Sequence, residues 1–244
     1  MRNREAWRPG RFLVTKKGLK ASRDSRQVGL GSRFIGDLQG VEYARAIRSH
    51  ARGLLLDLGC GNVPLYQFYR DLVTDNVCVD WVHTSHKSEH LDHECDLNQE
   101  LPLPSGHFDT ILATDVLEHI ADPDRLWQEM SRLVRPGGKI ILTVPFLYWI
   151  HEAPHDYARY TEFQLNRFCE RHGLGVASLK ACGGSVEAIL DIIAKHLAFS
   201  RVLSAIHLGV SKGIVRLIAG REFYKRIARQ FPLFYVLVAE KPAG

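Results

Sequence analysis

Short apolar runs recur through the middle of the chain, and each is followed by a polar or glycine-rich stretch. The runs lie at residues 54–58, 76–80, 109–114 and 139–144. Their hydrophobic residues follow one another without regular polar alternation, as in strands that are covered on both faces. The pattern therefore predicts short, buried strands.

Helical patterns separate these runs. A helical stretch is expected after the glycines that follow the first run, and it continues to about Leu72. A second helix is marked by Asp122 as its N-cap and Pro123 at its first position, and Pro136-Gly137-Gly138 stops it. Strands that alternate with helices in this way predict an α/β fold with a doubly wound, mainly parallel sheet.

The last third of the chain departs from this alternation. A helix is expected at 161–172 and a strand at 174–179, and then residues 186–229 are helical. A last strand follows at 233–239, close to the end of the sequence. A long helical insertion is therefore predicted before the last strand.

Charge divides the chain further. The 244 residues are 45% hydrophobic and 24% charged, which is typical of a globular protein. The net charge of +5 is concentrated at the start, because the first 33 residues hold ten Lys or Arg and two acids. We therefore expect a basic arm of low stability with at most a short helix, an α/β cofactor-binding domain, the helical insertion and the last strand, over residues 1–35, 36–183, 184–230 and 231–244.

The cysteines indicate a reducing compartment. None of the five belongs to a CxxC pair, and Cys60, Cys78 and Cys182 lie in apolar or glycine-rich surroundings. No apolar segment follows the arginine-rich start, as a secretory signal would require, and charged residues such as Asp191 and Lys195 interrupt the longest apolar stretch. We expect a cytoplasmic protein, and peripheral contact with a membrane stays open.

The first predicted strand runs into a glycine-rich loop, Asp57-Leu58-Gly59-Cys60-Gly61-Asn62. In a doubly wound sheet, ligands bind outside the carboxyl ends of the strands, where glycines let the backbone approach them. Asp80 ends the second strand and is placed to bind ribose hydroxyls, and Trp81 beside it can pack on an adenine face. Together these residues indicate a nucleotide site. The alternatives are that the glycine loop is only a tight turn, that Asp80 is a surface acid, and that Trp81 is a structural residue.

More motifs follow in a fixed order: Cys95-Asp96-Leu97-Asn98, Leu101-Pro102-Leu103-Pro104, Phe108-Asp109, Asp115-Val116-Leu117-Glu118-His119 and Arg135-Pro136-Gly137-Gly138. Together with the glycine loop and Asp80, this set resembles the class I S-adenosylmethionine-dependent methyltransferases, specifically their type 11 group. The resemblance covers about residues 50–180 and the last strand. It implies a Rossmann-like sheet of seven strands, whose final strand runs antiparallel between its neighbours.

The same resemblance implies that the cofactor is S-adenosylmethionine, with S-adenosylhomocysteine as the product. Asp80 would bind the ribose hydroxyls with Trp81 beside it, and Asp96 would accept a hydrogen bond from the adenine amino group. The remaining expected cofactor residues lie at the methionine end, beside the adenine ring or along the cofactor: Asp57, Gly59, Cys60, Gly61, Leu97, Thr114 and Asp115.

The glycine loop also bears on a rival function, hydride transfer with a nicotinamide cofactor. Dehydrogenases prefer GxGxxG, whose third glycine lets the helix pack on the strand, and Pro64 occupies that position here. Many methyltransferases continue the loop as GxGxG, whereas Asn62 and Val63 follow Gly61 in this chain. The sequence therefore does not predict the detailed shape of the loop, but S-adenosylmethionine is still expected as its ligand.

The acceptor is expected beside residues 145–161, which follow the 139–144 run and are dense in aromatic, imidazole and charged side chains. Methyl transfer is an in-line displacement that depends on alignment, and a hydroxyl acceptor also needs a base. We expect His155, and after it His151, to be that base, with Asp156 orienting an imidazole. The alternative is a packed polar loop. The residues expected to bind the acceptor are His119, Tyr148, Tyr157, Arg159 and Tyr160.

A histidine-rich stretch lies between the second and third runs. It contains His83, His86, His90, His93 and then Cys95. Zinc sites usually pair CxxC or HxxxH motifs on defined turns or helices, and this stretch has no second half of that kind. We expect polar loop residues here and no metal.

The combined features predict a methyltransferase that acts on a hydroxyl of a small-molecule, specialised-metabolite or glycan acceptor. One alternative is a nucleic-acid or protein methyltransferase, suggested by the basic arm, although the arm lacks the interleaved aromatic residues of a nucleic-acid platform. The other is a non-catalytic module that binds S-adenosylmethionine. The basic, apolar insertion is expected to be a lid, a membrane interface, a homodimer contact or part of the core.

Overall fold

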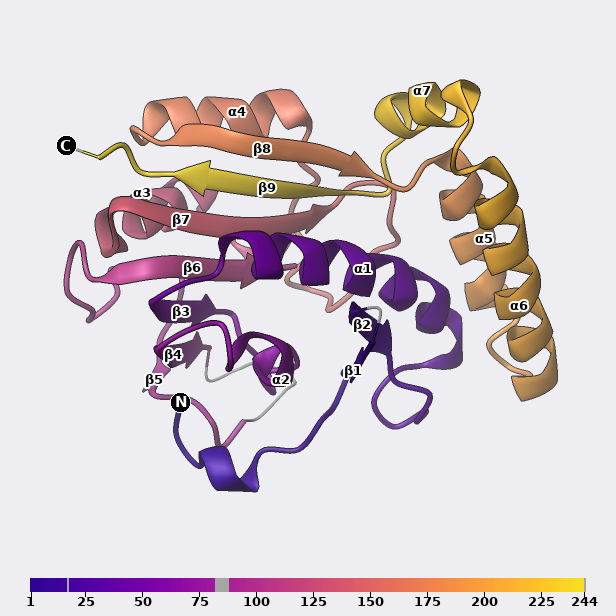
Figure 1. Cartoon of the computed structure of the whole chain (residues 1–244), viewed down its shortest axis with the longest axis horizontal. Helices are drawn as coiled ribbons and strands as arrows, with labels where there is room; N and C mark the ends of the chain where they lie inside the picture. The colour runs from indigo at the N-terminus through magenta and orange to yellow at the C-terminus, as the bar shows by residue number, and fades with distance from the viewer. Residues whose placement is uncertain (17, 82–87, 244) are drawn as a thin grey trace.

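A seven-stranded sheet forms the centre of the protein (Figure 1). The computed structural model describes residues 1–16, 18–81 and 88–243. The strands of the sheet are β3 (Leu54–Leu58), β4 (Asp75–Asp80), β5 (His93–Glu94), β6 (Phe108–Thr114), β7 (Val134–Pro145), β8 (Gly175–Cys182) and β9 (Phe234–Glu240). Their order is β5-β4-β3-β6-β7-β9-β8, and β9 runs antiparallel to both of its neighbours while the other pairs are parallel. The predicted doubly wound sheet with an antiparallel last strand is confirmed.

Helices cover both faces of this sheet. The first face carries α1 (Arg33–His50) and α2 (Tyr66–Tyr69), and the second carries α3 (Pro123–Leu133) and α4 (Glu162–Arg171). Neighbouring residues of a strand serve different layers. Ile111 belongs to the buried cluster that contains Trp127 of α3, whereas Leu112 belongs to the cluster that contains Tyr43 of α1. Burial on both faces accounts for the continuous apolar runs in the sequence.

The helices of the second face begin at the capping residues that the sequence marks. The side chain of Asp122 accepts a hydrogen bond from the backbone N–H of Arg125, at 3.2 Å. The hydroxyl of Thr161 does the same for Gln164 at the start of α4, at 3.4 Å. Such caps satisfy N–H groups of the first helical turn and fix where each helix begins.

Two elements differ from the prediction between β3 and β6. The helix expected up to Leu72 is reduced to the single turn of α2, after a loop in which Val63 has a φ of 50° and Pro64 has no N–H to donate. The edge strand β5 has only two residues, which are both polar, so it leaves no hydrophobic signal. His83 and His86 lie outside the described residues.

The N-terminal segment also differs from the expected arm. It contains the short helices η1 (Arg4–Ala6) and η2 (Leu30–Ser32) and a hairpin of β1 (Phe12–Thr15) and β2 (Gly18–Ala21). Trp7, Phe12 and Leu19 are buried in the core cluster of the first sheet face, and the N-terminal amino group pairs with Asp92 at 2.8 Å. Buried apolar side chains, which the basic charge conceals in the sequence, fix this segment to the domain.

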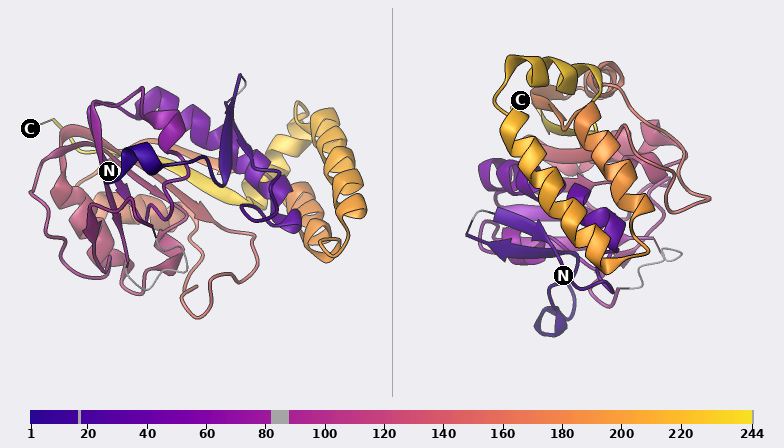
Figure 2. Two further views of the ribbon diagram at one scale, coloured as in Figure 1. Left: turned by 90° about the horizontal axis from the view of Figure 1, so that it is seen from below. Right: turned by 90° about the vertical axis from the view of Figure 1, so that its right-hand side faces the viewer.

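The predicted helical insertion consists of α5 (Ser185–His196), α6 (Arg201–Ile218) and α7 (Glu222–Gln230). Figure 2 shows α5 and α6 side by side beyond the carboxyl ends of the parallel strands. Several apolar side chains of these two helices and of the link between them are 56–82% exposed, namely Ile192, Phe199, Val202, Ile206 and Leu217. Within the described ranges, no helix by itself has the length and hydropathy of a membrane span, although α6 and α7 pass that test as a pair bent by 108°.

Candidate functional site

A cavity of about 940 Å³ opens at the carboxyl ends of β3, β4, β6 and β7. Its volume lies in the range of small-molecule and cofactor sites. The cavity is lined by every residue that the sequence assigns to the cofactor: Asp57, Gly59, Cys60, Gly61, Asp80, Trp81, Asp96, Leu97, Thr114 and Asp115. Strand ends from four places in the sequence therefore surround one space.

The glycine loop after β3 forms the floor of this cavity. Gly59 and Gly61 have φ angles of 64° and 50°, in the left-handed region that glycine occupies at little cost. The N–H groups of Gly59 and Cys60 donate to the carbonyl of Val79, at 2.8 and 3.2 Å, which ties the loop to β4. The loop therefore turns sharply and brings its backbone to the cavity surface.

Asp57 is a buried carboxyl group at the end of β3. Burial raises its pKa to about 7, although a hydrogen bond from the hydroxyl of Tyr69 at 3.0 Å acts in the opposite direction. A positively charged ligand beside this group would favour its ionised form. The amino group of a bound amino acid moiety supplies such a charge, so Asp57 suits the methionine end of the cofactor.

Asp80 joins the loop to the second strand end. One carboxylate oxygen accepts the N–H of Gly61 at 2.6 Å, and the other accepts the N–H of Trp81 at 2.7 Å. These contacts fix the carboxylate at the cavity wall, where it is placed to accept hydrogen bonds from ribose hydroxyls. Asp96 is fixed in a similar way, since one oxygen accepts from the backbone N–H and the side-chain amide of Asn98 at 2.9 and 2.8 Å.

Asp115 follows β6 and is held by α1. It has a φ of 54°, an uncommon backbone conformation for a non-glycine residue, and such conformations cluster at functional sites. Its carboxylate accepts hydrogen bonds from Tyr43 at 2.6 Å, from Gln39 at 3.1 Å and from Thr143 at 3.0 Å. Gln39 and Tyr43 were not predicted from the sequence. The one feature that could have indicated them is their spacing of four residues, which places both side chains on the same face of α1.

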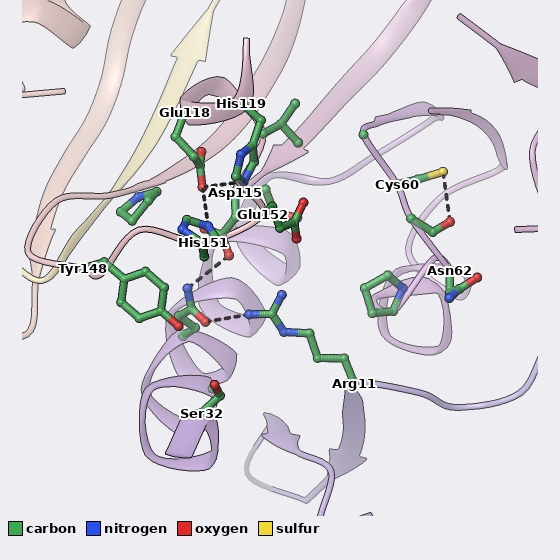
Figure 3. Close-up of a pocket in the computed structure, with 18 of the residues that line it drawn as sticks. Arg11, Ser32, Cys60, Asn62, Asp115, Glu118, His119, Tyr148, His151 and Glu152 are labelled. Carbon is green, nitrogen blue, oxygen red and sulfur yellow. Dashed lines mark hydrogen bonds and ion pairs between the residues drawn. The ribbon is translucent and has the colours of Figure 1, made fainter. Parts of the chain in front are cut away.

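The N-terminal segment contributes a wall that the sequence also did not indicate. Gly10, Arg11 and Phe12 line the cavity together with residues 26–29. Figure 3 shows Arg11, which directly precedes β1, reaching towards α1, where its guanidinium donates to the side-chain carbonyl of Gln39 at 3.3 Å. The segment therefore belongs to the site as well as to the core.

The loop over residues 145–161 closes the other end of the cavity. His119, Tyr148, His151, His155 and Tyr157, which the sequence places at the acceptor, all line it. Tyr157 donates its backbone N–H to the carbonyl of Glu118 at 2.8 Å. The loop is thus fastened to η3 (Leu117–His119), the short helix that follows β6.

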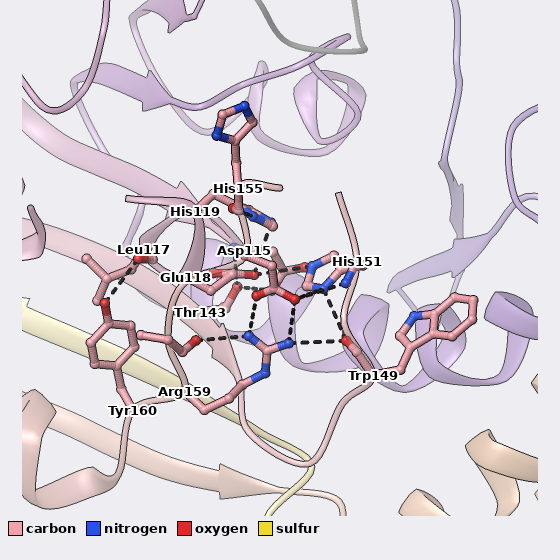
Figure 4. A network of polar contacts seen from close by, with 12 residues as sticks. Asp115, Leu117, Glu118, His119, Thr143, Trp149, His151, His155, Arg159 and Tyr160 are labelled. Carbon is pink, nitrogen blue, oxygen red and sulfur yellow. Dashed lines mark hydrogen bonds and ion pairs between the residues drawn. The ribbon is translucent and has the colours of Figure 1, made fainter. Parts of the chain in front are cut away.

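Three residues expected at the acceptor end do not line the cavity, namely Asp156, Arg159 and Tyr160. Arg159 donates to Asp156 at 2.8 Å and to the carbonyl of Trp149 at 3.1 Å, so its guanidinium serves the loop (Figure 4). The hydrogen bonds from Arg159 hold the pKa of Asp156 well below its usual value. Tyr160 is buried, and its hydroxyl donates to the carbonyl of Leu117 at 3.3 Å. Asp156 and Arg159, three residues apart, pair within the loop. The guanidinium of Arg159, which the sequence placed at the acceptor, is therefore directed to Asp156.

Two of the expected histidines differ in their surroundings. His151 contacts Asp156 with its Nδ1 at 3.3 Å, as expected of an imidazole oriented by that carboxylate, and burial lowers the pKa of His151. His155 instead contacts the hydroxyl of Tyr157 with its Nδ1 at 3.0 Å, and its ring stands edge-on to Trp81. In Figure 4 the His155 ring points away from the group formed by Glu118, His119 and His151.

Comparison with known proteins identifies the family. The sequence profile described as a methyltransferase domain matches residues 39–179. The ubiquinone biosynthesis O-methyltransferase of Chromobacterium violaceum is 28% identical over an alignment of 159 residues, which covers 53% of this chain and 67% of that protein. The chain spans 43–67% of the length of such curated relatives.

Solved structures share the fold. An S-adenosylmethionine-dependent methyltransferase from Mesorhizobium loti has a TM-score of 0.56 at 13% identity, over 85% of this chain and all of that one. The cyclase SpnF has a TM-score of 0.55 at 18% identity, over 92% of this chain and 99% of that one. These likenesses show the architecture, and the family profile spans more than half of the chain. The chain therefore belongs to the methyltransferase-domain family and is a class I S-adenosylmethionine-dependent methyltransferase.

Proposed function

We propose that this enzyme methylates a hydroxyl group of a small-molecule or glycan acceptor, bound where residues 145–161 close the cavity. The observation that carries the proposal is the group of polar rings beyond the cofactor residues. His119, Tyr148, His151, His155 and Tyr157 line this end and offer imidazole and hydroxyl partners. Such partners suit a neutral, hydroxylated ligand, since Arg159 is engaged by Asp156.

His155 is proposed as the base, which accepts the hydroxyl proton at Nε2. When its Nδ1–H donates to the oxygen of Tyr157, Nε2 keeps a lone pair. S-adenosylmethionine, when bound, supplies the methyl group. The acceptor oxygen bonds to this carbon while the electron pair of the carbon–sulfur bond goes to sulfur. Alignment contributes up to about 7–11 kcal/mol to such reactions. His151, held by Asp156, is proposed to shape the acceptor end.

The relatives support oxygen as the methylated atom. The curated proteins that match this chain are named as O-methyltransferases of ubiquinone biosynthesis, at 25–29% identity. Because they match over part of their length and at low identity, the ring system of the acceptor is not inferred from them. We carry over the hydroxyl group alone, and with it a small acceptor.

Ion pairs formed by arginines of the N-terminal segment support a small acceptor over a nucleic acid. Arg4 pairs with Asp75, and Arg23 pairs with Asp37 at 2.6 Å. Nucleic-acid affinity rises with the number of cations that are available to phosphates. Pairing within the fold explains part of the basic charge without such a ligand.

The helical insertion is proposed as a contact surface, either with a membrane or with a second copy of the chain. Its exposed apolar side chains, among them Phe199 at 82%, support a partner that covers them. Lys195 of α5 also lies over the rings of Tyr148 and Trp149, 4.4 and 5.1 Å from their centroids. A partner on the insertion would therefore act next to the acceptor loop.

The proposal predicts where a labelled methyl group goes. The full chain is incubated with methyl-labelled S-adenosylmethionine and, in separate reactions, a panel of phenols and hydroxylated glycans, total RNA or unfolded protein. We expect label in the phenol or glycan reactions, as an ether that survives alkali. Label found in the RNA or protein reactions and in none of the small acceptors would contradict the proposal.

A further inference from the structure

Glu118 is a buried carboxylate to which no described residue donates a hydrogen bond. Its side chain is 0% exposed, and among the described residues neither oxygen has a donor within hydrogen-bond distance. It nevertheless lines the cavity, at its acceptor end. A buried, unpaired carboxylate is costly, so native proteins usually compensate for it.

Two imidazoles face this carboxylate. The Nε2 atoms of His119 and His151 each lie 3.8 Å from Oε1 of Glu118. Figure 3 shows the two rings beside this carboxylate. The two rings meet edge to face with their centroids 4.8 Å apart. The side chains of His119 and His151 are 16% and 20% exposed, so the group is open to the cavity on one side.

The other nitrogen of each ring is occupied. Nδ1 of His119 lies 2.6 Å from the carbonyl oxygen of His155, which can only accept, so this nitrogen carries the proton. Nδ1 of His151 lies 3.3 Å from both the carbonyl of Trp149 and the carboxylate of Asp156. When the two rings are neutral, the lone pair of each is therefore on Nε2, the nitrogen that lies 3.8 Å from Glu118.

We propose that Glu118, His119 and His151 form a binding site for a divalent transition-metal cation such as Zn²⁺. Metal-binding histidines usually donate their second N–H to a carbonyl or a carboxylate, and both rings here have such a partner. Asp156, which contacts His151 from outside the cavity lining, is itself held by Arg159.

The ligand types and their spacing suit this cation. Two imidazoles and one carboxylate are typical of first-row transition metals, whereas Mg²⁺ and Ca²⁺ prefer oxygen ligands. The three ligand atoms lie within 4.8 Å of one another. Ligands bound tetrahedrally at about 2.0–2.2 Å lie roughly 3.4 Å apart, so closing the site needs side-chain movements of about 1 Å.

A bound cation would supply the partner that Glu118 lacks among the described residues. The competing explanation is a neutral, protonated Glu118 that shapes the pocket without a metal.

The site differs from the histidine-rich stretch at 83–95, which was considered from the sequence. Its ligands come from two segments, η3 and the loop 145–161, that only the fold brings together. Three ligands leave coordination positions open towards the cavity, where an acceptor oxygen could bind. This catalytic consequence rests on the proposed function, but cation binding does not.

The experiment is a calorimetric titration of the chelator-treated full chain with Zn²⁺ at neutral pH, together with zinc X-ray absorption of the wild type. We expect one equivalent to bind, with two imidazole nitrogens at about 2.0–2.1 Å. Glu118→Gln and His151→Ala should each weaken binding by at least about 100-fold, and Asp156→Asn, which changes a supporting residue, by about 10-fold. His93→Gln is the matched control and should leave the affinity unchanged.

Each outcome decides the proposal. No binding by the wild type, binding that survives Glu118→Gln, or equal loss in His93→Gln would overturn it in favour of a protonated Glu118 or of surface histidines. If Glu118→Gln does not fold, the wild-type absorption spectrum and His151→Ala still test the ligand set. Hydroxyl methylation by a chain that binds no cation would refute this inference alone. One-equivalent binding without any methylation would instead refute the proposed function.

Discussion

Replacing His155 with alanine is expected to slow methyl transfer to a hydroxyl acceptor by about 10²–10⁴-fold, the usual contribution of a positioned base. Because His155 contacts the expected cofactor residues only through the ring of Trp81, the affinity for S-adenosylmethionine should change much less than the rate. The measurement is the single-turnover rate together with the cofactor dissociation constant. A loss confined to the rate distinguishes a base from a residue that binds the cofactor.

His155→Gln is the matched variant for this test. Glutamine can keep a hydrogen bond to Tyr157 and fill the space beside Trp81, but it cannot take the proton. It should therefore be as slow as His155→Ala, and both should become faster as the pH rises and the acceptor ionises by itself. Wild-type rates in both variants would remove His155 from this role.

Gly59→Ala is expected to lower the free energy of unfolding by about 2–5 kcal/mol. A left-handed backbone costs a non-glycine residue about 1–2 kcal/mol, and Gly59 has a φ of 64°. The added Cβ would also lie 2.5 Å from a methyl carbon of Val116, and such overpacking typically costs about 1–3 kcal/mol. Relief of the contact would shift the loop, so cofactor binding should weaken strongly as well.

The control for this prediction is Gly106→Ala. Gly106 has nearly the same φ, 62°, but nothing lies within 4 Å of an added Cβ. Denaturant unfolding should therefore show only the backbone cost of about 1–2 kcal/mol, and the cofactor should bind as in the wild type. Equal losses in the two variants would mean that the contact with Val116 does not constrain the loop.

The sheet could be predicted because burial on both faces leaves continuous apolar runs. β3, β6 and β7 are visible for this reason, and the Asp122 cap makes α3 visible as well. β5 has two polar residues and left no signal. α1 was not predicted, because Gly36 and Gly40 weaken its helical pattern. Both glycines let β2 approach the helix: a Cβ on Gly36 would lie 2.9 Å from Ala21, and one on Gly40 would lie 2.9 Å from the carbonyl of Leu19.

The cofactor side of the site could be predicted from local motifs, since strand ends and glycine turns place residues without help from distant segments. The acceptor side could not be predicted in the same detail. Whether Arg159 faces a ligand or pairs with Asp156 depends on the path of the loop, which residue types do not reveal. The burial of Glu118 and its approach to His151 likewise depend on the fold.

The central claim is that the cavity binds S-adenosylmethionine through the strand ends of β3 and β4. It is tested most directly by calorimetric titration of the wild type and of Asp80→Ala with S-adenosylmethionine and with NADH. We predict one-to-one, micromolar binding of S-adenosylmethionine to the wild type, loss of that binding in Asp80→Ala, and no binding of NADH. Binding of NADH alone, or no binding of S-adenosylmethionine to the folded wild type, would contradict the account.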